Sequence, residues 1–212
     1  PTSMWDDWSR LVARVRTRPG DFGRPSYWLI GPADSTNGFI TWASTEVSNR
    51  NPFQLRTPDR RIQGPTGPAS PGKYFTYNNN NIFTASRGTY RFSHYYFHRY
   101  GTQDTWETEP QPDMLVSEMN LLKAEGLIRL GQADEAVPLI NLTRVANGEL
   151  PPVTIDGPPD EPGCVPRKLN GQCASLWDAL RYEKRMEGVG VTGVIAFFDA
   201  RGWQALAANS II

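Results

Sequence analysis

The chain has 212 residues, with 22 basic and 22 acidic side chains that give a formal net charge of zero. A chain of this length can bury the core of one domain. Because it carries no excess positive charge, the composition argues against nucleic acid as a partner. No apolar run approaches the roughly 20 residues that a membrane-spanning helix needs.

The first predicted element is a helix over residues 1–18. Trp5, Trp8 and Leu11 repeat at helical spacing, and Pro19 with the glycine after it ends the helix. The sequence begins with proline and shows neither a signal peptide nor a lipobox cysteine. We therefore expect a processed product or part of a longer chain, which leaves export open.

Residues 19–112 are expected to form a loop-rich insertion. Short strands are predicted near 27–30 and 39–42, and the aromatic segment 90–100 is predicted to be extended. The run over 63–72 is so rich in glycine and proline that it cannot form regular structure. Little β structure is expected overall.

A helical hairpin is predicted over 113–148. Asp113 is the expected cap of its first helix, and the turn falls at residues 130–132. Pro138 is expected in the first turn of the second helix, where its missing N–H costs least. Gly148 ends that helix.

Residues 149–174 form a proline-rich loop that contains both cysteines, Cys164 and Cys173. Neither a CxxC spacing nor a nearby histidine suggests zinc or redox chemistry. We expect a disulfide that closes a surface loop, implies an oxidising compartment and stabilises the fold by roughly 2–3 kcal/mol. The alternative is two free thiols in a cytosolic protein.

Residues 175–212 are predicted to form C-terminal helices. Ser175 can cap a helix that runs to about Glu187, and glycines follow it. Helical character returns over residues 194–208, around two phenylalanines and a tryptophan.

Several short motifs follow one another in a fixed order along the C-terminal half. They comprise Glu118, Leu121, Ala124, Glu125 and Leu130-Gly131, then Ala136, Asn141, Arg144 and Gly148, then Leu176–Glu187, then Phe198, Asp199, Arg201 and Trp203, and more weakly Thr57–Arg61 upstream. Together they resemble the C-terminal signature of the SusD/RagB family, the lipid-anchored glycan-capture proteins of Bacteroidetes-type outer membranes. Leu115 and Ala146 depart from it, since the family usually has arginine at both positions.

The resemblance implies a mainly α fold of tetratricopeptide-like helical hairpins with long irregular loops, in which residues 1–212 form a single SusD-like C-terminal domain. It also implies a non-enzymatic protein exported to the periplasm or outer-membrane surface of a Gram-negative bacterium. Its expected partners are a TonB-dependent transporter and an oligosaccharide or other nutrient. The alternative is a structural scaffold subunit docked on the periplasmic face of a membrane protein complex.

Two acidic residues, Glu118 and Glu125, lie on one face of the first hairpin helix, about 10.5 Å apart by helical rise. A glycosidase acid and base would need about 5 Å or about 6.5–9.5 Å. The other interpretation is structural, because buried carboxylates need cationic partners. We expect ion pairs with Arg144, Arg181 or Arg185 on neighbouring helices.

Aromatic residues in coil-rich stretches are the candidates for ligand binding, because flat rings stack on the apolar faces of sugars. The candidate ligand-binding residues are Trp28, Trp42, Tyr77, Asn79 and Trp106. For each ring taken singly, packing in the core or in a partner interface is the favoured interpretation, because the chain is poor in aliphatic side chains that could fill a core.

The remaining chemical signals are weak. His94 and His98, the two histidines, lie in an aromatic run without an acidic ligand, which favours packing over a metal site. Asp156 and Asp160 offer carboxylates to calcium but lack the EF-hand pattern. No catalytic motif is present, so we expect no enzyme activity, no metal and no cofactor, with calcium as the alternative.

Overall fold

The computed structural model describes residues 24–79, 93–100, 112, 114–160, 163–191 and 195–204. The helix predicted over 1–18 and the candidate Trp106 lie outside these residues. Within them the protein is mainly helical and has one two-stranded sheet, which confirms the predicted fold class. The tetratricopeptide-like character of the hairpin stays a prediction.

Helices α4 (Val116–Arg129) and α5 (Ala133–Ala146) form the predicted hairpin. Gly131 adopts a positive φ of 79° in the turn between them, a conformation that glycine adopts without strain. Leu115 precedes α4 and makes no side-chain cap, and Asp113 lies outside the described residues. Pro138 lies in the second turn of α5, one turn later than predicted.

Helix α6 (Leu176–Gly188) begins as the sequence predicts. The Ser175 hydroxyl accepts a hydrogen bond from Asp178 N at 3.2 Å, and the Asp178 carboxylate accepts from Ser175 N at 3.4 Å. This capping box satisfies two backbone donors at the helix start. Helix α7 (Ile195–Gly202) follows and packs against α6.

Both strands predicted near residues 27–30 and 39–42 are wrong, because these segments are helices. They form α2 (Tyr27–Ile30) and α3 (Gly38–Ser44), with short 3-10 helices at Gly31–Ala33 and Val47–Asn49. The Ser26 hydroxyl caps α2, and the buried Asp34 carboxylate accepts from Phe39 N at 2.9 Å. These local polar contacts outweigh the strand preference of the aromatic side chains.

The sheet pairs β1 (Phe75–Tyr77) with β2 (Tyr95–Phe97) in antiparallel register, with Phe75 opposite Phe97. Strand β2 confirms part of the predicted extended segment. Alternate side chains of β2 point into the core, since Tyr95 and Phe97 are buried.

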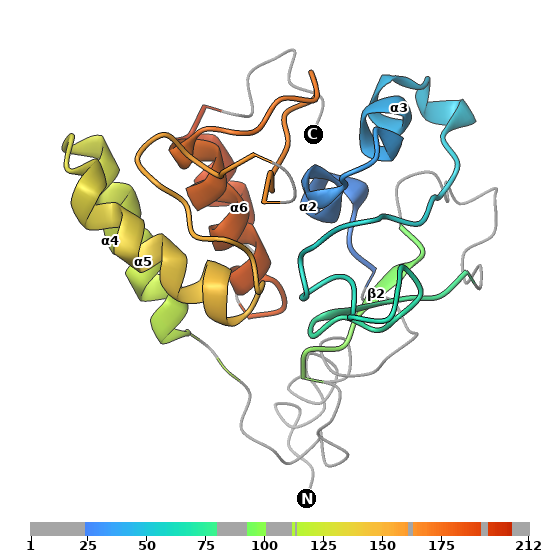
Figure 1. The fold of residues 1–212 in the computed structure, drawn as a ribbon, viewed down its shortest axis with the longest axis horizontal. Coiled ribbons are helices and arrows are strands. Elements are labelled where there is room, and N and C mark those ends of the chain that lie inside the picture. The colour runs from blue at the N-terminus through green and yellow to red at the C-terminus, as the bar shows by residue number, and fades with distance from the viewer. Residues whose placement is uncertain are drawn as a thin grey trace, which may run out of the picture.

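Helix α6 lies between the α4–α5 hairpin and α2 (Figure 1). Its residues Leu176, Ala179 and Leu180 join the apolar core of the hairpin. Tyr182 and Met186 join the second core, formed by α2, α3, the sheet and their loops. One helix therefore completes both cores.

No helix in the described part of the chain is long and apolar enough to cross a membrane.

The capping box gives the first testable prediction. Ser175→Ala removes the hydroxyl that accepts from Asp178 N, so we expect a loss of about 1 kcal/mol in the free energy of unfolding. In a domain of this size that corresponds to a melting temperature about 2–4 °C lower. Thermal unfolding followed by circular dichroism measures it, and Ser44→Ala, a change at an exposed hydroxyl, is the control. An equal fall in the melting temperature of both variants would contradict the assignment of Ser175 as the helix cap.

Candidate functional site

A buried ionic network centred on Arg61 is the most prominent polar feature of the fold. The Arg61 guanidinium donates to Asp59 at 2.8 Å, to Glu183 at 2.7 and 2.9 Å, and to Glu187 at 3.1 Å. All four side chains are fully buried. One cation thus joins a loop of the N-terminal half to α6.

Each carboxylate of the network also accepts a hydrogen bond from a second donor. The Tyr182 hydroxyl donates to Asp59 at 2.6 Å, and the Thr143 hydroxyl donates to Glu183 at 2.8 Å. Glu187 accepts from the Tyr74 hydroxyl at 3.0 Å and from Arg99 at 3.0 Å. Buried charges need such saturation, because each unmade hydrogen bond would leave a desolvated oxygen.

Local structure places these groups. The Asp59 carboxylate accepts from Arg61 N at 2.9 Å, which folds residues 59–61 into a tight turn. The Arg61 carbonyl accepts from Tyr74 N at 2.9 Å and so anchors the segment that enters β1. Glu183 and Glu187 lie four residues apart on α6 and therefore face the same side.

Burial and charge act in opposite directions on the groups of this network. Burial alone would lower the pKa of Arg61, but Asp59 and Glu183 outweigh it and hold that pKa well above its ordinary value. Burial raises the pKa of Tyr182, and the negative charge of Asp59 raises it further. The arginine therefore stays charged and the tyrosine stays a neutral donor.

A second network links α4, α6 and α7 around Lys184. The Lys184 ammonium donates to Glu125 at 2.6 Å and to Asp199 at 2.8 Å. Glu125 also accepts from Arg129 at 2.8 Å and from the Trp203 indole at 2.9 Å. Burial would raise the pKa of Glu125, but these three donors outweigh it and lower the pKa.

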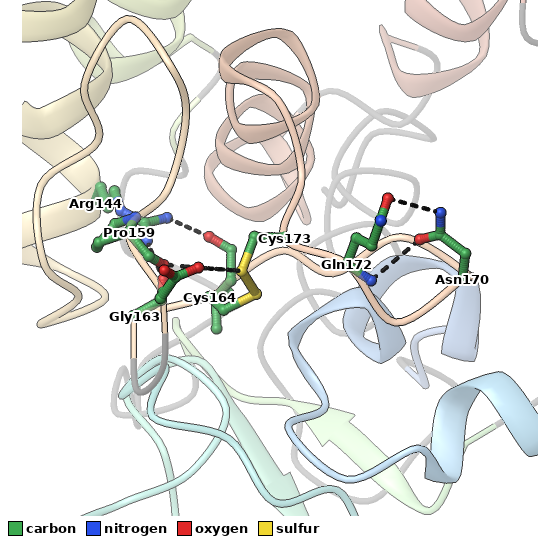
Figure 2. Close-up of a disulfide and its surroundings, with 9 residues drawn as sticks. Arg144, Pro159, Gly163, Cys164, Asn170, Gln172 and Cys173 are labelled. Atoms are coloured by element: carbon green, nitrogen blue, oxygen red, sulfur yellow. Dashed lines mark hydrogen bonds between the residues drawn. A yellow bond between two sulfur atoms is a disulfide. The ribbon is translucent and has the colours of Figure 1, made fainter.

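Arg144 occupies a third polar position, where α5 meets the disulfide loop. Its guanidinium donates to the carbonyls of Pro151 at 2.6 Å, Val165 at 2.6 Å and Gly163 at 2.9 Å. Cys164 lies between two of these residues and is bonded to Cys173, so the predicted disulfide is confirmed. Figure 2 shows Arg144 next to this segment of the loop. The disulfide therefore closes the loop that carries two of the acceptors of Arg144.

The predicted partners of Glu118 and Glu125 need correction. Glu125 is ion-paired as expected, but with Lys184 and Arg129. Arg144 points from α5 towards the loop carbonyls, so it does not reach α4. Arg185 lies over the Trp203 ring at 5.7 Å. Glu118 is buried on α4.

The structure packs the described candidate aromatic residues against other rings. Trp42 is buried, and Trp28 is half-buried against it with ring centroids 5.8 Å apart. Tyr77 packs on Tyr95 of the sheet, with centroids 5.2 Å apart. Only Asn79 of the described candidates is exposed. Packing therefore accounts for these aromatic rings as well as ligand binding does.

The histidines and loop acids remain separate from one another. His98 Nε2 lies 2.9 Å from the Gly72 carbonyl, and burial lowers the pKa of His94. Asp156 and Asp160 are both exposed. Among the residues that the structure describes, no group of three or more histidine, cysteine, aspartate or glutamate side chains could hold a metal ion.

Sequence reasoning missed the network around Arg61. A signal was present, because Asp59 and Arg61 belong to a motif with a weak family resemblance, and Glu183 and Glu187 share a helix face. What the sequence did not reveal is that this turn and this helix meet across a sequence separation of 122 residues.

Comparisons of the chain with protein-family models, with curated proteins and with solved structures give no match. The resemblance to the SusD/RagB family therefore stays a prediction that rests on the motif residues.

Replacing the central cation tests the first network. Arg61→Met leaves three buried carboxylates without their shared partner, so we expect unfolding free energy to fall by about 3–5 kcal/mol. Urea unfolding measures this loss. Arg60→Met is the matched control, because Arg60 is partly exposed and forms a long ion pair of 3.8 Å with Glu149, which predicts a change below about 1 kcal/mol. Similar losses in the two variants would refute the central role of Arg61.

The lowered pKa of Glu125 predicts a pH-dependent effect. A carboxylate whose folded pKa is depressed stabilises the fold above its unfolded pKa, and this stabilisation is lost as pH falls through the folded value. Glu125→Gln should therefore lower the melting temperature near pH 7, and the difference from the parent should shrink below about pH 4.3. Glu135→Gln, which changes an exposed acid of α5, is the control. A difference that stays constant between pH 7 and pH 3 would contradict the prediction.

Proposed function

We propose that the chain is a non-enzymatic SusD-like binding protein of the cell envelope, which assists a TonB-dependent transporter in capturing a glycan or other nutrient. The proposal rests on the positions of the motif residues in the fold. Glu125, Lys184 and Asp199 come from three separate motifs of the resemblance and meet in one network. Convergence of this kind is expected if the motifs specify one family scaffold.

The acidic residues support a non-enzymatic function. A general acid of a glycosidase needs a raised pKa, whereas hydrogen bonds from Lys184, Arg129 and Trp203 lower the pKa of Glu125. Glu183 is likewise occupied by Arg61 and Thr143. The disulfide supports the exported location, because such bonds persist in oxidising compartments.

Affinity electrophoresis tests glycan capture. Retarded migration in gels that contain soluble polysaccharides is the expected result. Asn79→Ala should reduce the retardation if the exposed end of β1 contributes to the site. Asn51→Ala changes an exposed asparagine of another loop and should leave migration unchanged. Unretarded migration across a panel of neutral and acidic polysaccharides would overturn the capture function.

A second candidate function is a scaffold subunit docked on the periplasmic face of a membrane protein complex. It is favoured by apolar side chains on the outer face of α4, where Val116, Met119 and Leu122 are 77%, 52% and 55% exposed. Leu142 and Val145 of α5 are also exposed. Exposed apolar patches of this kind often mark protein interaction sites.

Co-purification tests the scaffold function. The tagged chain should copurify in fixed stoichiometry with one integral membrane complex from detergent-solubilised membranes. Leu122→Lys places a charge on the apolar face and should abolish the association. Lys123→Ala changes the neighbouring exposed residue and should preserve it. Equal recovery with both variants would overturn this function.

A further inference from the structure

The side of α6 that faces α7 carries a group of cations and rings that the two networks do not fully use. Trp177, Arg181, Lys184 and Arg185 lie at helical spacing on this side. The Trp203 ring packs against them, with Trp177 at 6.3 Å between centroids. Both rings are half-buried.

Arg185 is the first of two cations whose hydrogen-bond donors are not all satisfied by the described residues. Its guanidinium lies 5.7 Å from the centroid of Trp203, and the described part of the chain gives it no ion pair or hydrogen bond. Burial lowers its pKa, and the neighbouring charge of Arg181 lowers it further. The charges of Asp199 and Asp178 act in the opposite direction, but the ion pairs of these carboxylates are with Lys184 and Arg181.

Arg181 shares this deficiency. Its contact with Asp178 is long, at 3.5 Å, and its Nε is buried without a hydrogen-bond partner among the described residues. A quarter of its side chain, 25%, is exposed. Its guanidinium lies 5.0 Å from the centroid of Trp203, on the same ring as Arg185. A partly buried donor without an acceptor can donate to a bound ligand, ion or water.

The adjacent cations Lys184 and Arg129, in contrast, each have carboxylate partners at short distance. Lys184 has two carboxylates at 2.6 and 2.8 Å, and Arg129 has Glu125 at 2.8 Å. This group of side chains therefore contains one more cation than carboxylates. Its cations are Arg129, Arg181, Lys184 and Arg185, and its carboxylates are Glu125, Asp178 and Asp199. The excess of one positive charge falls on the pair Arg181 and Arg185.

We propose that Arg181 and Arg185, beside Trp203, form a binding site for one oxyanion, the carboxylate or phosphate group of a small ligand. Guanidinium groups bind planar oxyanions through paired, charge-assisted hydrogen bonds, which partial burial strengthens. The rings of Trp177 and Trp203 place apolar surface beside the guanidinium groups. A free phosphate or a sugar acid would satisfy this chemistry, and the site does not depend on the proposed function.

Titrations followed by the indole N–H signals of tryptophan test the site. Sodium phosphate, sodium galacturonate and neutral galactose are compared at constant ionic strength. Saturable shifts with phosphate alone would identify free phosphate as the source, and shifts with galacturonate identify a sugar carboxylate. Equal binding of galactose and galacturonate, or no saturable shift with either anion, overturns the proposal.

Variants assign the binding to the arginine pair. Arg185→Gln should lower the affinity for the anion at least tenfold. Arg185→Lys keeps the positive charge and should lower the affinity less. Arg201→Gln removes an exposed arginine of α7 with the same change of charge and should bind like the parent. If Arg185→Gln disrupts the fold, the test rests on Arg185→Lys and Arg201→Gln. Anion binding that is unchanged in Arg185→Lys but lost in Arg201→Gln would overturn the site.

Discussion

The buried guanidinium of Arg61 is the constraint on which the arrangement of the fold depends. It must keep contact with Asp59, Glu183 and Glu187 at once, because no water reaches these side chains. This requirement sets the distance between the 59–61 turn and α6. Replacing one partner leaves a buried charge, whereas the intact network adds little net stability after desolvation. Its contribution is therefore to specify one arrangement over others.

The Lys184 network likewise fixes how α6 is arranged relative to its neighbours, on the other side of the helix. Lys184 binds Glu125 of α4 and Asp199 of α7, so three helices meet at one ammonium group. The residues that resemble the SusD/RagB motifs are therefore largely structural. In this chain the motifs hold helices together, while Arg181, Arg185 and Trp203 of the same motifs carry the proposed oxyanion site.

Local signals in the sequence predicted some elements well. Ser175 and Asp178 form a capping box within one turn, so the start of α6 could be predicted without knowledge of the rest of the fold. The segments around Trp28 and Phe39 were predicted as strands and are helices. There the aromatic composition favoured β structure, while the deciding contacts were single polar side chains, such as Asp34 five residues before Phe39.

Partner identities were harder to predict than helices. Successive residues on a helix point about 100° apart, so a small rotation of α6 decides which cation reaches α4. Lys184 does so, while Arg181 and Arg185 lie against Trp203. Long-range pairs such as Arg61 with Glu187 depend on the tertiary packing of two distant segments, which no local pattern encodes.

The double role of α6 has a consequence for folding during synthesis. Tyr182 and Met186 complete a core whose other members lie mostly between residues 27 and 97. Arg61 reaches its partners only across 122 and 126 positions. The N-terminal half therefore cannot finish its core until α6 has left the ribosome. Long contact separations of this kind slow folding and prolong exposure of apolar surface, so the apolar side chains of this core stay exposed until α6 emerges.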